Sequence, residues 1–170
     1  MVADIGGVDV TILATILAAH PDLHGISFNR DLGRARDHLT RAALTGRAEL
    51  VAGDFLDGPL PPASTYLLAS VLNGHDDAGA RVILGNIRAA ATSGPRLILA
   101  GILLPGQPTP HIGYDLDVQM MALGTGQERT RDAYLTLLRD AGFHSTEVIG
   151  TPYGLSIIDA QPTTAAAWPA

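Results

Sequence analysis

The sequence has no cysteine, so disulfides, thiolate metal sites and cysteine nucleophiles are all excluded. It also has no lysine. Its 11 basic residues are all arginine and stand against 17 acidic ones, which gives a net charge of −6. A nucleic-acid-binding surface needs the opposite balance, and we therefore expect no nucleic-acid partner.

Long hydrophobic runs are missing as well. The longest apolar stretch, Leu97 to Leu104, is interrupted by Gly101 and is far shorter than the roughly 20 residues of a membrane-spanning helix. The first residues, Met1 to Ile5, show no basic segment ahead of an apolar one, so no secretory signal is expected. These features predict no membrane partner and a cytoplasmic location.

What remains has the composition of an ordinary folded domain. The chain has 170 residues, of which 46% are hydrophobic and 16% charged, and this excludes the disordered and low-complexity classes. A chain of this length makes about one domain. We expect a single domain over residues 1–160, followed by a flexible tail over residues 161–170.

Short β-rich runs alternate with helical patterns along the whole chain, which is typical of an α/β fold whose sheet is largely parallel. Asp77 is expected to cap the helix that begins at Ala78. The first helix is apolar on more than one side, so we expect it to lie between the sheet and a further element. The seven expected strands are Val2–Ile5, His24–Phe28, Ala48–Ala52, Ser64–Ala69, Arg96–Ile102, His144–Val148 and Ser156–Ala160, and the expected helices are Thr11–Ala19, Gly33–Ala43, Ala78–Thr92, Leu116–Leu123 and Arg131–Ala141.

The first strand runs into a glycine turn, Asp4-Ile5-Gly6-Gly7, ahead of the first helix. Sheets of this kind bind ligands outside the carboxyl ends of their strands. Glycines there let the backbone approach a nucleotide-like ligand and present amide groups to it. An ordinary tight turn is the alternative interpretation of the same residues.

Five segments follow one another in an order that resembles a known family over Val2 to Pro162. The family is that of the S-adenosylmethionine-dependent O-methyltransferases of the plant caffeate and bacterial polyketide-tailoring type, and the similarity is to their C-terminal catalytic domain. This resemblance implies a doubly wound, mostly parallel seven-stranded sheet whose last strand is antiparallel. The five segments are Asp4-Ile5-Gly6-Gly7, Gly53-Asp54-Phe55, Leu72-Asn73-Gly74-His75-Asp76-Asp77, Gln127-Glu128-Arg129-Thr130 and Leu138-Arg139-Asp140-Ala141-Gly142-Phe143.

The resemblance implies a cofactor site for S-adenosylmethionine. Asp4, Gly6 and Gly7 would line it, and Asp54 with Phe55 would hold the adenine. Asn29 stands where the family has an acid that binds the ribose hydroxyls, and an amide makes that contact without charge assistance.

The loop also departs from the family, because Val8 and Val10 replace glycines. A positive φ at a β-branched residue costs about 1–2 kcal/mol. We therefore expect a reshaped or strained turn, and a cofactor that binds weakly or no longer binds.

The catalytic segment departs from the family too. Asn73 stands at the position of the family's general base, a histidine, and cannot take a proton at neutral pH. Gly101 replaces one of two acids that orient the base, which leaves Glu128 as the remaining acid. A surface carboxylate in the first turn of a helix is the alternative interpretation of Glu128. His75 lies two residues beyond Asn73 and is not expected to replace the base, and the histidines form no metal-binding set.

Three functions are compatible with this pattern. The first is methyl transfer to the hydroxyl of a small aromatic or polyketide acceptor, in which orientation supplies most of the rate. The second is a catalytically impaired or repurposed homologue that acts as a binding or partner subunit. The third is a related reaction without methyl transfer. Family members also carry an N-terminal helical domain, so the resemblance implies a homodimer or a separate subunit that supplies it.

Overall fold

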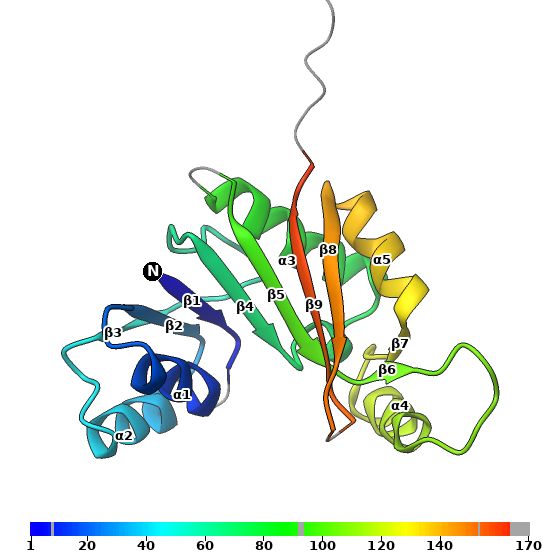
Figure 1. Ribbon diagram of the computed structural model, residues 1–170, viewed down its shortest axis with the longest axis horizontal. Helices are drawn as coiled ribbons and strands as arrows, with labels where there is room; N and C mark the ends of the chain where they lie inside the picture. The colour runs from blue at the N-terminus through cyan, green and yellow to red at the C-terminus, as the bar shows by residue number, and fades with distance from the viewer. Residues whose placement is uncertain (8, 92–93, 153, 164–170) are drawn as a thin grey trace, which may run out of the picture.

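The computed structural model describes residues 1–7, 9–91, 94–152 and 154–163. One seven-stranded sheet, in the order β3-β2-β1-β4-β5-β9-β8, runs through the molecule and carries helices on both faces (Figure 1). The strands are β1 (Val2–Ile5), β2 (Gly25–Asn29), β3 (Ala48–Ala52), β4 (Thr65–Ala69), β5 (Arg96–Gly101), β8 (Phe143–Gly150) and β9 (Ser156–Pro162). The helices are α1 (Thr11–Ala19), α2 (Gly33–Arg41), α3 (Asp77–Ala90), α4 (Ile112–Leu123) and α5 (Arg131–Asp140), with a 3-10 turn, η1 (Leu72–Gly74), after β4.

The sheet has the expected α/β architecture. Strands β1 to β5 pair in parallel with one another. Strand β9 is antiparallel to both of its neighbours, β5 and β8. The prediction of a doubly wound, mostly parallel sheet with an antiparallel last strand is therefore confirmed. Two short strands that the sequence did not reveal, β6 (Leu103–Leu104) and β7 (Arg129–Thr130), pair with each other in a separate two-stranded sheet.

Most element boundaries lie within two residues of expectation, and three differ in an informative way. The cap of α3 is Asp76, whose carboxylate accepts a hydrogen bond from the Gly79 amide at 2.8 Å, so the assignment of this cap to Asp77 was wrong. Helix α4 begins four residues before the expected Leu116, because His111 caps it by accepting from the Gly113 amide. Strand β9 extends to Pro162, which places residues 161 and 162 in the sheet and not in a tail, and residues 164–170 lie outside the described part of the chain.

Two hydrophobic cores form on opposite faces of the sheet. Helices α3 and α5 pack on one face, where Tyr66, Leu84 and Leu138 are fully buried in the larger core. Helices α1 and α2 cover the other face over β1 to β3, where Leu13, Leu17 and Leu39 form the smaller core. Because the two groups of helices lie at different ends of the sheet, only part of it is covered on both sides (Figure 1).

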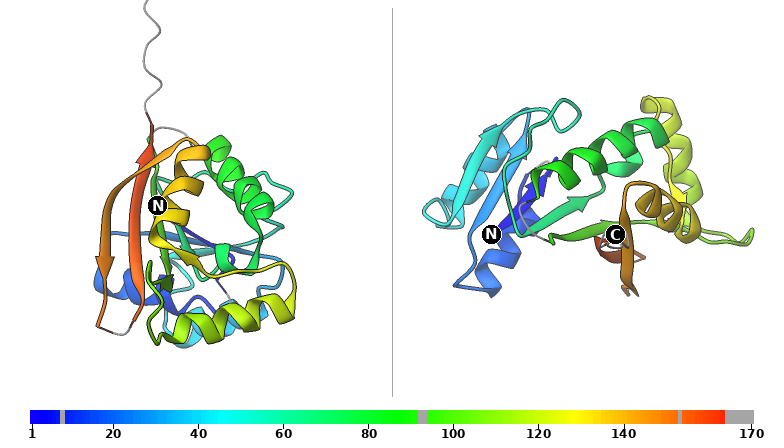
Figure 2. Two further views of the ribbon diagram at one scale, coloured as in Figure 1. Left: turned by 90° about the vertical axis from the view of Figure 1, so that its right-hand side faces the viewer. Right: turned by 90° about the horizontal axis from the view of Figure 1, so that it is seen from above.

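Strands β4, β5, β9 and β8 are covered on one face alone. The views in Figures 1 and 2 show no described helix over the other face of these strands. A groove of about 650 Å³ runs along this face, and Ile16 of α1, Ile98 of β5 and Ile157 of β9 line it. Helix α1 thus has the two apolar sides that its sequence predicted, one against the sheet and one facing this groove.

Within the described residues, no helix is long and apolar enough to cross a membrane.

Candidate functional site

The candidate site lies at the carboxyl ends of β1 to β4. The chain winds from β1 to β2 and β3 on one side and places β4 on the other, so β1 and β4 flank the point where the strand order reverses. Ligands of open α/β sheets bind at this point. The segments that follow the four strands bring together the glycine turn, Asn29, Asp54 with Phe55, and the Ser70–His75 segment.

Asp4 is the most unusual charged residue at this edge. It is 2% exposed, and its Oδ1 atom has no hydrogen-bond partner among the described residues. Burial, with a smaller effect of Asp9, raises the pKa of Asp4 to about 6. A hollow of about 150 Å³, lined also by Gly7, Val10 and Ala69, opens beside this carboxyl group. A buried carboxylate with a free oxygen favours a cationic or hydrogen-bond-donating ligand.

The two glycines make room for this arrangement. A Cβ atom at Gly7 would lie 2.3 Å from Oδ2 of Asp4, so a side chain there would displace the carboxylate. Gly6 has a φ of 77° and lies against Phe55 and Val71, which would be 3.1 Å from a Cβ atom. The glycine turn therefore joins the end of β1 to the segments that follow β3 and β4.

Val10 adopts a left-handed conformation, with a φ of 57°. This geometry costs a β-branched residue about 1–2 kcal/mol. The side chain is 2% exposed and packs in the core under α1, and burial of a valine is worth about 1.5–3 kcal/mol. The expected strain is thus present at Val10 and is held by packing, while Val8 lies outside the described residues.

Asn29 and Asp54 already have partners in the structure. The Asn29 amide donates to the Gly7 carbonyl at 3.0 Å and accepts from the Arg30 amide at 2.7 Å, so it braces the glycine turn. Asp54 accepts from the Leu56 amide at 2.9 Å and pairs with the Arg30 guanidinium. Both contacts keep the pKa of Asp54 below its usual value, and the Leu56 bond has the larger effect.

Phe55 and His75 link the two sides of the site. Their rings meet edge to face with centroids 5.6 Å apart. Burial lowers the pKa of His75 and so favours the neutral form of its ring. The edge-to-face contact orients the His75 ring toward Phe55. The structure shows no hydrogen bond from this ring to Asn73 or Glu128.

Asn73 and Glu128 meet although 55 residues separate them in the chain. The Asn73 side-chain amide donates to Oε1 of Glu128 at 2.8 Å, and the Glu128 backbone amide donates to Asp117 of α4 at 2.7 Å. Glu128 is 6% exposed, so its interpretation as a surface carboxylate was wrong. Oδ1 of Asn73 and Oε2 of Glu128 are both buried without a partner among the described residues.

Arg129 holds the loop that carries Asn73. Its guanidinium is 3% exposed and donates to the carbonyls of Leu72 and His75, each at 2.8 Å, and to Asp77. It also lies over the Tyr134 ring, 5.8 Å from the centroid. Arg129 stands in the Gln127–Thr130 segment, and its sequence gives no sign that an arginine beside a glutamate is buried.

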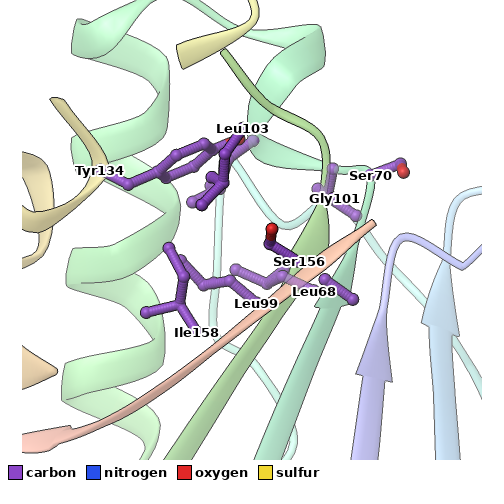
Figure 3. Close-up of a pocket in the computed structure, with 11 residues that line it drawn as sticks. Leu68, Ser70, Leu99, Gly101, Leu103, Tyr134, Ser156 and Ile158 are labelled. Atoms are coloured by element: carbon purple, nitrogen blue, oxygen red, sulfur yellow. The ribbon is translucent and has the colours of Figure 1, made fainter. Parts of the chain in front are cut away.

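Gly101 leaves a small space at the position where the sequence resemblance implies a second acid. With Ser70, Tyr134 and Ser156 it lines a cavity of about 10 Å³, which is room for about one water molecule (Figure 3). No acidic side chain lines this cavity.

A family model for the O-methyltransferase domain matches residues 1–144. The chain belongs to the O-methyltransferase family. O-demethylpuromycin-O-methyltransferase of Streptomyces alboniger is 37% identical to it, over 95% of this chain and 45% of that protein. Phenazine O-methyltransferase PhzM of Lysobacter antibioticus is 34% identical, over 95% of this chain and 48% of that protein.

Solved structures of O-methyltransferases have the same fold. NcsB1, an O-methyltransferase of neocarzinostatin biosynthesis, superposes with a TM-score of 0.84 at 28% identity, over 96% of this chain and 48% of that one. It was solved with S-adenosylmethionine and 2-hydroxy-5-methyl naphthoic acid. This O-methyltransferase chain spans about half the length of the curated relatives it matches.

The resemblance inferred from the five segments is thus confirmed. The structure brings all the predicted site residues of this O-methyltransferase chain to one edge of the sheet. The residues that sequence reasoning missed are Arg129, Asp117 and Gly126. A Cβ atom at Gly126 would lie 2.6 Å from the Asn73 carbonyl, and only the glycine-rich spacing ahead of Gln127 hinted at this close approach.

Proposed function

We propose that this chain is the catalytic part of an S-adenosylmethionine-dependent O-methyltransferase that acts on the hydroxyl group of a small aromatic or polyketide acceptor. The observation that carries the proposal is that one edge of the sheet holds several buried polar atoms without partners. The free carboxylate oxygen of Asp4 and the Asn73–Glu128 pair lie at the same sheet edge, joined through the contact between Gly6 and Val71.

The residues at the glycine turn fit this cofactor. S-adenosylmethionine carries an ammonium group and, when bound, supplies an electrophilic methyl group on a sulfonium centre. Asp4 would bind the ammonium group through its buried carboxylate, and Gly6 and Gly7 leave room for the ligand beside it. Asn29 and Asp54, with the Phe55 ring, would contact the ribose and the adenine. Because Asn29 is neutral, its ribose contact is weaker than that of an acid.

The acceptor would approach from η1 and α4. Asn73 of η1 and Met120 of α4 are in contact, with Nδ2 of Asn73 3.9 Å from the Met120 sulfur. An unbranched methionine side chain can move aside at small cost, which suits an aromatic ligand. The relatives support this acceptor class, since their names describe O-methylation of aromatic and antibiotic molecules.

Calorimetric titration with S-adenosylmethionine and S-adenosylhomocysteine tests the cofactor site. We expect binding to the folded chain, and a loss of at least tenfold in Asp4→Asn, because a hydrogen bond to a charged group is worth about 1.5–3 kcal/mol. Asp22→Asn, a change at an exposed carboxylate, is the matched control. Folded protein that gives no heat with either ligand at millimolar concentration refutes the proposal.

Two other functions are compatible with the sequence pattern. The repurposed-subunit alternative finds no support, since the relatives are themselves described as O-methyltransferases. The reaction without methyl transfer rests on no particular residue, and product mass separates it, because methyl transfer adds one methyl group to the acceptor.

We further propose that the apolar groove over β4, β5, β9 and β8 binds an amphipathic helical segment. Both faces of a largely parallel sheet are normally covered by helices, and β5 is apolar on both sides (Leu97 to Ala100). The matched relatives contain about as many residues again as this chain aligns with, and these residues need a surface to pack on. The groove and the segment that it binds would then form parts of one enzyme. We propose that this enzyme acts in the cytoplasm, because the reducing conditions there suit a chain without cysteine.

A polypeptide that corresponds to the unmatched half of the Streptomyces alboniger relative is the probe. We expect it to bind the chain, and Ile98→Glu to weaken that binding, while Val82→Glu, at an exposed position of α3, leaves it unchanged. Light scattering that instead shows dimers of the chain alone, lost in Ile98→Glu, assigns the groove to a second copy and overturns this proposal.

A further inference from the structure

Nothing in the Asn73 side chain can serve as the base that methyl transfer to a hydroxyl group requires. A carboxamide does not accept a proton near neutral pH. Its donating end is already committed to Oε1 of Glu128 at 2.8 Å. The carbonyl oxygen of Asn73, Oδ1, is buried without a partner in the described structure.

Glu128 offers the group that Asn73 lacks. It is 6% exposed, its Oε1 atom is held by Asn73, and its Oε2 atom has no donor among the described residues. Leaving a buried carboxylate oxygen without a donor costs about 1–3 kcal/mol or more. An unpaired buried polar atom in a native structure calls for an explanation, and a catalytic role is one of those found. A hydroxyl group of the acceptor can supply the missing donor.

We propose that Glu128 is the catalytic base, and that Asn73 is a positioning residue that holds the carboxylate in place. The inference rests on the proposed O-methyltransferase function. The acceptor hydroxyl donates to Oε2 of Glu128. Its O–H bond breaks, the electron pair stays on the acceptor oxygen, and the proton goes to Oε2. The negative charge therefore moves from Glu128 to the acceptor, and the neutral carboxylic acid keeps its hydrogen bond with Asn73.

The charged groups around Glu128 suit this role. Burial raises the pKa of Glu128 above its usual value and outweighs the Asn73 bond, which lowers it. Asp117 of α4 adds a smaller rise and the Arg129 guanidinium a still smaller fall. Arg129 is bonded to Asp77, Leu72 and His75, and the described residues place no cation within salt-bridge distance of Glu128. On the α5 side, burial raises the pKa of Tyr134 to about 12, so that ring is neutral at working pH.

The strength of this base selects the acceptor. At ordinary pKa values a carboxylate is a weaker base than the imidazole it replaces, and burial of Glu128 narrows that difference. It can deprotonate a phenol or an enol, whose ionised form is accessible, but not an aliphatic alcohol. The substrate class is therefore an acidic aromatic or enolic hydroxyl, and rates should rise as electron-withdrawing substituents make the phenol more acidic.

Glu128→Gln tests the assignment, because glutamine keeps the shape of the side chain and can still accept from Asn73. In the 170-residue chain with S-adenosylmethionine and a panel of substituted phenols, we expect kcat to fall at least 100-fold, the usual contribution of a general base. S-adenosylhomocysteine affinity should stay within threefold. Asn73→Ala should lower kcat about tenfold and leave the pH profile governed by Glu128.

A spectroscopic measurement gives a readout apart from turnover. 4-Nitrophenol is titrated into the chain with S-adenosylhomocysteine bound, at a pH below the pKa of the free phenol. Wild-type protein should show phenolate absorbance on binding, Asn73→Ala should retain it, and Glu128→Gln should lose it. Asn73→His added to Glu128→Gln should restore both the absorbance and part of kcat, through a new base at the neighbouring position.

Three outcomes overturn the inference. The first is Glu128→Gln with kcat within threefold of wild type. The second is Asn73→Ala more damaged than Glu128→Gln. The third is phenolate absorbance that does not depend on Glu128. If Glu128→Gln does not fold, as judged by circular dichroism, a wild-type rate that is independent of phenol acidity across the panel also overturns it. Failure of the underlying function has a different signature, since wild-type protein then binds no S-adenosylhomocysteine and yields no methylated product.

Discussion

Asp4→Asn should make the protein more stable at neutral pH while it impairs the cofactor site. Burial shifts the pKa of Asp4 from 3.8 to about 6. At about 1.4 kcal/mol per pKa unit, the ionised form costs the fold about 3 kcal/mol. Asparagine removes that cost, but its buried amide lacks a hydrogen-bond partner, and this destabilises the fold by about 1 kcal/mol. The net gain is about 2 kcal/mol at pH 7, or a rise of about 4–8 °C in Tm for a chain of this size.

The sign of the pH dependence follows from the direction of the shift. Below pH 4, Asp4 is protonated in both the folded and the unfolded chain and carries no penalty. As the pH rises from 4 toward 6, Asp4 ionises in the unfolded chain while it is still largely protonated in the folded chain. The free energy of unfolding therefore falls over this range. The advantage of Asp4→Asn over wild type should therefore appear between pH 4 and 6 and stay constant above.

Urea unfolding followed by circular dichroism, at pH steps from 4 to 7.5, measures this difference. Asp9→Asn is the matched control. It keeps an acceptor for the Thr11 amide and removes only the smaller contribution to the pKa of Asp4, so its effect should be a fraction of that of Asp4→Asn. Parallel stability profiles for wild type and Asp4→Asn over this range would refute the burial of an ionisable carboxylate at the end of β1.

Three further predictions concern the same edge of the sheet. S-adenosylhomocysteine affinity, measured by calorimetry, should fall as the pH drops below about 6, because protonated Asp4 no longer attracts a cation, and a flat profile from pH 5 to 7.5 contradicts this. Gly126→Ala should lower kcat at least tenfold by displacing η1, while Gly124→Ala, where a Cβ atom meets nothing within 4 Å, should not, and equal rates for the two variants count against the close approach. Arg129→Met should lower the free energy of unfolding by about 1–3 kcal/mol by leaving the carbonyls of Leu72 and His75 without their donor. Arg131→Met, at an exposed position, should change it by less than about 0.5 kcal/mol, and similar urea midpoints for the two would disprove the burial argument.

The elements that sequence reasoning located well are those with strong local signals. Strands β1 and β3 and the start of α2 match expectation residue for residue, because their apolar runs and flanking turns are distinctive. Helix α4 was recognised only from Leu116, since a histidine cap is not among the usual sequence signatures of a helix start. Strands β6 and β7 were missed because two residues are too few to show a period.

The candidate site divides in the same way. The glycine turn could be predicted because glycine adopts backbone conformations that other residues avoid, so two glycines after a strand indicate a turn. The burial of Glu128 and its bond to Asn73 could not be predicted, since they depend on a contact across 55 residues. The alternative that placed Glu128 on the surface was reasonable for a carboxylate next to a helix start, and packing against α4 and η1 overrides it.

By itself, the sequence determined the alternation of strands and helices, the family, and which residue types stand at the carboxyl edge of the sheet, because these follow from local pattern and motif order. Only the tertiary structure decided which polar atoms are buried and left without a partner, among them those of Asp4, Asn73 and Glu128 in the candidate site. Burial and partnership depend on segments distant in the chain, and they set the pKa and the hydrogen-bonding capacity of each group. The chemistry proposed for this site is therefore a property of the fold, carried by residues whose types alone allowed several functions.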